Sequence, residues 1–76
     1  MSVLDDLANA LRLLQTPGKD AAKNWAWQTR QLMREEKKTL DHAATTAAKA
    51  VFSEFDPLKY KVGSVDEALL KRIEAF

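Results

Sequence analysis

Residues 19–55 read KDAAKNWAWQTRQLMREEKKTLDHAATTAAKAVFSEF, about half of a 76-residue chain, without one glycine or proline. Placed at about 100° per residue, most of the apolar residues from Ala21 to Phe55 share one face. Glycine and proline are the usual helix breakers, so the pattern predicts one long helix. At about 1.5 Å per residue this helix would reach about 55 Å, whereas a compact domain of this size is roughly 30 Å across.

The charged run 34–38 offers one place where this helix could break. Thr39 can act as the N-cap of a new helix, with Asp41 in its first turn. The apolar phase nevertheless continues across the run, and we therefore favour a continuous helix. A break near Lys38 would instead give a compact four-helix bundle and would weaken the case for self-association.

Two shorter helices are expected to flank the long one. Residues 3–15 carry leucines at spacings of three and four and stop before Pro17-Gly18. Residues 65–75 follow a capping box formed by Ser64 and Glu67. The fold class predicted is all-α, with a single domain over residues 1–76.

The segment between the last two helices is expected to be an extended connector over residues 58–63. Its apolar side chains alternate with lysines and would pin the connector to the long helix. Pairing of this segment as a strand with another copy or protein is the alternative. Phe52 and Leu70 fall on polar faces in this scheme and are expected to be exposed.

The composition gives little support to an enzyme or a metalloprotein. The chain has no cysteine and a single histidine, His42, which has no metal-ligand partner at helical spacing. No serine or threonine has a general base in reach, so we expect no catalytic residue, cofactor or metal. The absence of a basic leader and of a long apolar run predicts a cytoplasmic protein that does not enter membranes.

A basic row with one aromatic residue is the strongest candidate for a binding site. The net charge is only +1, but residues 19–38 hold six basic and three acidic residues. Trp25 and Trp27 lie about 200° apart on a helix, so Trp25 is assigned to the core and Trp27 to the outer face. The predicted partner-binding residues share that outer face and are Lys23, Trp27, Arg30, Arg34 and Lys38.

A second candidate surface consists of small residues in the second half of the long helix. Alanine lets a neighbouring helix approach closely, and one short helix cannot fill the resulting groove. The residues predicted to pack against a second subunit in a homodimer are Ala43, Ala44, Ala47 and Val51.

These features predict a non-enzymatic protein–protein interaction module, such as an adaptor, an inhibitor or a small subunit of an assembly. Its partner would offer an acidic or mixed surface to the outer face of the long helix, where tryptophan and arginine commonly dominate binding energy. The alternative is a nucleic-acid-binding protein that stacks bases on Trp27 and contacts phosphates through the row. No motif is specific enough to indicate a family.

Overall fold

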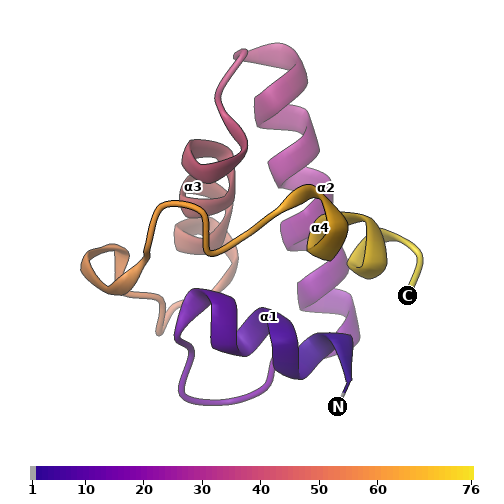
Figure 1. Ribbon diagram of the computed structural model, residues 1–76, viewed down its shortest axis with the longest axis vertical. Coiled ribbons are helices and arrows are strands. Elements are labelled where there is room, and N and C mark those ends of the chain that lie inside the picture. Colours follow the sequence, from indigo (N-terminus) through magenta and orange to yellow (C-terminus); the bar gives the residue numbers. More distant parts are fainter. Residues whose placement is uncertain (1) are drawn as a thin grey trace.

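The computed structural model describes residues 2–76, which form four α-helices and a short 3-10 helix without any strand (Figure 1). The helices are α1 (Val3–Leu11), α2 (Lys19–Glu35), α3 (Leu40–Val51) and α4 (Glu67–Glu74), and the 3-10 helix η1 spans Pro57–Lys59. The all-α prediction is confirmed. None of the described helices is long and apolar enough to cross a membrane.

The predicted continuous helix over residues 19–55 is wrong. α2 ends at Glu35 and α3 begins at Leu40, so the chain reverses at the charged run (Figure 1). Thr39 is the N-cap of α3 and accepts a hydrogen bond from the His42 amide at 3.3 Å. The protein is compact, with a radius of gyration of 10.9 Å. Self-association was predicted because a long helix would extend beyond its own domain, and that reason no longer holds.

Two helices end next to a basic residue in the left-handed conformation. Lys37 follows α2 with a φ of 54°, and Arg12 follows α1 with a φ of 55°. The next amide then bonds back to the last helical turn: Lys38 N donates to Leu32 O, and Leu13 N donates to Ala8 O. Glycine is the usual residue at such helix ends. Because these two positions are occupied by lysine and arginine, the sequence does not mark either helix end with a glycine.

The early end of α1 corrects the predicted helix over residues 3–15. Leu7 and Leu11 are buried as expected, but Leu14 lies beyond the helix and is 86% exposed. The turn that begins at Arg12 thus removes Leu14 from the row of buried leucines, and the chain reaches Gly18 through a loop.

The centre of the core is the contact between α2 and α3. Trp25 is fully buried there, and its indole Nε1 donates a hydrogen bond to the Ala44 carbonyl oxygen at 3.0 Å. Alanines on the facing side of α3 have no exposed surface, which lets the two helices approach closely. Phe52, expected to be exposed, is also buried, because α3 ends before it and the chain turns back toward the core.

α4 packs against α2 and α1 and not over the second half of the predicted long helix. Its N-cap is Asp66, which accepts a hydrogen bond from the Leu69 amide at 2.8 Å, so the capping box predicted from Ser64 is wrong. Leu70 is fully buried and not exposed, because α4 lies between two helices. Glu67 is left free to bind another residue.

The connector before α4 is pinned by one residue and not by an alternating set. Leu58, in η1, is 93% exposed and Val62 is 86% exposed, whereas Tyr60 is half-buried. The Tyr60 ring packs edge-on against Phe55 with ring centroids 6.2 Å apart. The 3-10 turn at Pro57–Lys59 breaks the alternation that the extended connector required.

Candidate interaction surface between α2 and α4

The two tryptophans of α2 occupy opposite environments, as their helical phase predicts. Trp25 has no exposed surface, whereas 61% of Trp27 is exposed. Tryptophan has a large apolar ring and is usually well covered. Trp27 is therefore the largest of the exposed apolar side chains among residues 2–76.

Trp27 lines a pocket between α2 and the end of α4. Lys23 and Glu74 are the other lining residues, and the pocket has a volume of about 320 Å³. The Lys23 ammonium donates a hydrogen bond to the Glu74 carbonyl oxygen at 2.6 Å. This bond holds the lysine side chain across the gap between the helices, so that its aliphatic stem forms a wall next to the indole ring.

Arg30 fastens α4 to α2 through two carboxylates. Its guanidinium binds Glu67, and it donates hydrogen bonds to Glu74 at 3.0 to 3.3 Å. The bonds to Glu74 and Glu67 raise the pKa of Arg30, and the bond from Arg30 lowers the pKa of Glu67. Arg30 is therefore occupied within the monomer, although the sequence placed it in the partner-binding row.

Of the other residues in the predicted row, Arg34 lies inside α2 and Lys38 lies after its end. Arg34 lies in the last turn of α2 and is exposed. Lys38 lies beyond the helix, in the turn to α3, with its ammonium 3.9 Å from a Glu36 carboxylate oxygen. The structure thus keeps Lys23, Trp27 and Arg34 on one surface and removes Arg30 and Lys38 from it.

The surface predicted for a second subunit is covered inside the monomer. Ala43, Ala44 and Ala47 are fully buried, and only Val51 of that set is partly exposed. α2 turns back onto α3 and fills the groove that the prediction left for another copy. The alanines therefore act in the packing of this chain against itself.

Sequence reasoning missed the contribution of α4 to the surface. Glu67 and Glu74 lie seven residues apart on α4 and both bind Arg30, with Lys71 between them at helical spacing. Phe76 is 45% exposed, and the Lys19 ammonium lies 5.4 Å from the centre of its ring. The spacing on α4 is visible in the sequence, but only the tertiary placement of α4 shows which helix it faces.

A second, shallower pocket of about 470 Å³ lies between α3 and the connector. Its lining residues are Thr39, Asp41, His42, Thr45, Tyr60 and Val62. One Asp41 carboxylate oxygen accepts hydrogen bonds from the Gly63 amide at 3.0 Å and from the Tyr60 hydroxyl at 3.4 Å. Burial, together with the Asp41 charge, raises the pKa of Tyr60 to about 12. These polar groups hold the connector on α3.

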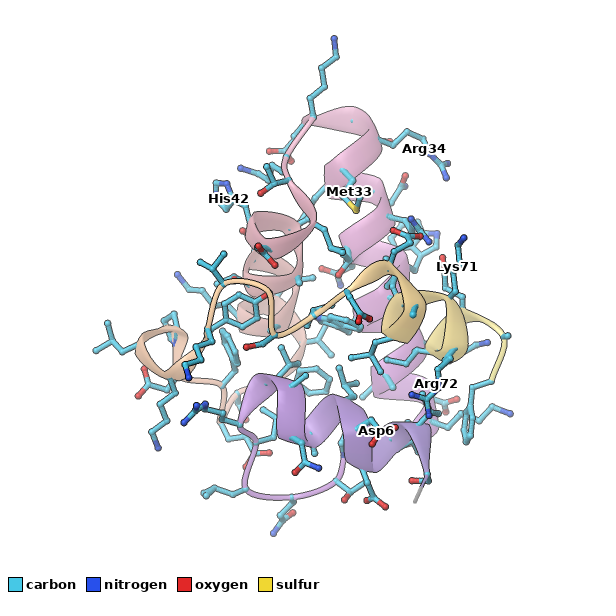
Figure 2. The ribbon with its side chains drawn as sticks, viewed as in Figure 1. Asp6, Met33, Arg34, His42, Lys71 and Arg72 are labelled. Carbon is cyan, nitrogen blue, oxygen red and sulfur yellow. The ribbon has the colours of Figure 1, made fainter. Side chains whose placement is uncertain are left out.

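The described residues do not form a metal site. Between residues 2 and 76 there is no group of three or more histidine or carboxylate side chains placed to hold a metal ion. His42 is exposed and extends from α3 away from α4 (Figure 2).

Comparisons of the chain with protein families, with curated proteins and with solved structures gave no match.

Proposed function

We propose that the chain is a non-enzymatic protein–protein interaction module that binds its partner through the outer face of α2, with Trp27 as the anchor. The observation that carries the proposal is the 61% exposure of Trp27 beside a pocket between two helices. A small adaptor, an inhibitor or a subunit of a larger assembly would each use such an anchor. A chain without cysteine suits the reducing cytoplasm, which we propose as its setting.

The neighbours of Trp27 on α2 support this proposal. Asn24, Gln28 and Gln31 extend the outer face beside it and carry no charge. Lysine and glutamate are depleted at the centre of protein interfaces, whereas aromatic residues and arginine are enriched. The face of α2 is therefore uncharged on one side of Trp27, whereas Lys23, Arg30 and Arg34 lie on its other side.

The polar groups around the pocket support binding more than catalysis. The ammonium of Lys23 is engaged by a carbonyl oxygen, and the carboxylate of Glu74 is engaged by Arg30. A general acid or base must contact the reacting group and must itself be free to donate or accept a proton. Groups already held in internal bonds serve better as walls of a recognition site.

Nucleic-acid binding is the second candidate and has less support. Stacking of a base on Trp27 remains physically reasonable, with Lys23 and Arg34 next to it. Glu67 and Glu74 neutralise Arg30 in the middle of the predicted row, so no continuous line of free cations is left to follow a phosphate backbone. A steep loss of affinity with added salt would favour nucleic acid, because each neutralised phosphate releases counterions.

The test compares capture of cellular proteins by the wild-type chain, by Trp27→Ala and by Val62→Ala. Val62 is also apolar and exposed but lies on the connector, so it serves as the matched control. We expect one or more proteins to bind the wild type and Val62→Ala and to be lost with Trp27→Ala, and to bind again when purified. Equal capture by all three chains would overturn the proposal.

A further inference from the structure

The surface around Trp27 contains two cationic side chains that the monomer does not use. Arg34 of α2 and Lys71 of α4 are both exposed, and neither forms an ion pair with any of residues 2–76. Figure 2 shows both side chains extending outward on the same side of the molecule. Their positive charge is therefore available to a partner.

The charge of the whole surface is positive after the internal pairs are counted. The basic side chains on the outer face of α2 and the adjoining side of α4 are Lys19, Lys23, Arg30, Arg34 and Lys71, and the acidic ones are Asp20, Glu67 and Glu74. Five cations against three carboxylates leave a net charge of +2. Glu67 and Glu74 bind Arg30, and the charge of Lys19 offsets that of Asp20, so the excess positive charge resides on the two unused side chains and on Lys23.

The pocket next to Trp27 is suited to an apolar side chain. Its two polar lining residues are held by internal bonds, Lys23 at the Glu74 carbonyl oxygen and Glu74 at Arg30. A group that entered the pocket would meet the indole ring and the aliphatic stems of these residues. Since the walls are already fixed, little side-chain entropy would be lost when the pocket is filled.

The spacing along α2 defines where the partner's charge should lie. Arg34 follows Trp27 by seven residues, which is two helical turns or about 10.5 Å. A helical segment that lies along α2 would therefore reach Arg34 with a carboxylate placed about two turns from its apolar anchor. Amphipathic segments of this kind bind grooves through anchors at helical spacing.

We propose that the α2–α4 surface, defined by Lys23, Trp27, Arg34, Lys71 and Phe76, is a docking site for an acidic amphipathic segment of a partner protein. An apolar side chain of the segment fills the pocket at Trp27, and its carboxylates pair with Arg34 and Lys71. This inference rests on the proposed function and specifies the chemistry of the partner.

The experiment selects ligands without assuming a native partner. A library of random peptides displayed on phage is panned against the full wild-type chain, and the enriched peptides are synthesised. Their affinities are then measured by isothermal titration calorimetry against the wild type, Trp27→Ala and the double variant Arg34→Glu/Lys71→Glu. Lys59→Glu is the matched control, because Lys59 is an exposed lysine on the distant connector. Single-stranded oligothymidylate is titrated in parallel.

The inference predicts enriched peptides with an aromatic or aliphatic anchor and acidic residues about two turns away. Trp27→Ala should weaken their binding about thirtyfold, as expected for an interface anchor. The double charge reversal should weaken it about tenfold, Lys59→Glu should leave it unchanged, and peptides with lysine in place of the acidic residues should recover binding to the double variant.

Three results would overturn the inference. Enriched peptides without acidic residues that still require Trp27 would refute the acidic partner and leave the proposed function standing. Tighter binding of oligothymidylate than of any peptide would assign the surface to nucleic acid. Failure to obtain any peptide that requires Trp27 would also refute the docking site, while capture of a cellular protein that depends on Trp27 would show that the proposed function survives.

Discussion

α2 contacts its two neighbours in different ways. Toward α3 it presents Trp25 to a row of buried alanines, and one buried hydrogen bond links the two helices. Toward α4 it presents Arg30 to two glutamates that are each more than a third exposed. Close apolar packing stabilises the first contact, whereas solvent-screened charge pairs secure the edge of the second. Trp27, the exposed tryptophan, lies at the second contact and not at the first.

The largest effect should come from removing the tryptophan at the α3 contact. Trp25→Ala deletes a fully buried ring, leaves a cavity and removes the hydrogen bond to the Ala44 carbonyl oxygen, which should cost about 3–5 kcal/mol of the free energy of unfolding. Urea-induced unfolding followed by far-ultraviolet circular dichroism measures the loss. A cost no larger than that of Trp27→Ala would show that the two contacts do not differ.

Overfilling the same contact should have the next largest effect. Ala47→Leu inserts side-chain volume where α3 is fully covered and should cost about 1–3 kcal/mol. Ala50→Leu, on the exposed side of the same helix, is the matched control and should change little. The same unfolding measurement applies, and stabilisation by Ala47→Leu would mean that the space between the helices is wider than described.

The turn that brings α3 against α2 can be tested with glycine. Lys37→Gly removes the cost of a side chain in the left-handed conformation and should stabilise the protein by about 1 kcal/mol. Lys38→Gly, at a residue with ordinary φ, should give no such gain. If the helix were continuous, glycine at residue 37 would destabilise it by a similar amount, so the sign of the change in urea unfolding separates the two structures.

Acidification should weaken the ion pair between Arg30 of α2 and Glu67 of α4. The bond from Arg30 holds the pKa of Glu67 in the folded protein below its ordinary value of 4.5. The stabilisation is therefore present above this value and is lost as the pH falls through the folded pKa. Because Glu67 is well exposed, the loss should stay below about 1 kcal/mol.

The pH effect is measured by comparing the wild type with Glu67→Gln in unfolding experiments from about pH 7 to about pH 3. The wild type should be the more stable of the two at neutral pH, and the difference should close in acid. A difference that stays constant over this range would show that the ion pair contributes nothing through its charge.

Trp27→Ala should have the smallest effect on stability. The ring is mostly exposed, so its removal should change the free energy of unfolding by no more than about 0.5 kcal/mol. A loss comparable to that of Trp25→Ala in the same measurement would give Trp27 a structural role and would remove the reason for treating it as an anchor.

Helical phase was sufficient to predict which tryptophan is buried, and local composition was sufficient for the all-α class. Trp25 and Trp27 differ by about 200° around one helix, and this relation holds whatever α2 packs against. The N-cap role of Thr39 was also visible as an alternative, because it needs only a threonine before a helical segment.

The position of the helix ends could not be derived in this way. Lys37 and Arg12 occupy a conformation that favours glycine, and the sequence carries no mark of it at either residue. At Lys37, the turn allows α3 to pack against α2, which offsets the local cost. Continuity of the apolar phase across residues 34–38 fits two helices on one core as well as it fits one long helix.

The α4 side of the candidate surface depended on tertiary placement. Glu67 was assigned to a capping box because it follows Ser64 by three residues, yet Asp66 takes the capping role and Glu67 binds Arg30. That choice depends on where α4 lies relative to α2. The basic row therefore looked unpaired in the sequence, although its central member is neutralised in the fold.

The contrast between the two tryptophans also means that intrinsic tryptophan fluorescence can report on binding and on folding separately. The indole of Trp25 is shielded in the core, and that of Trp27 faces solvent. A soluble collisional quencher should therefore dim the emission of Trp27 and spare that of Trp25. Recovery of the quenched emission would report that a partner has covered Trp27, while the protected emission would report that the fold is intact, with no dye attached to the chain.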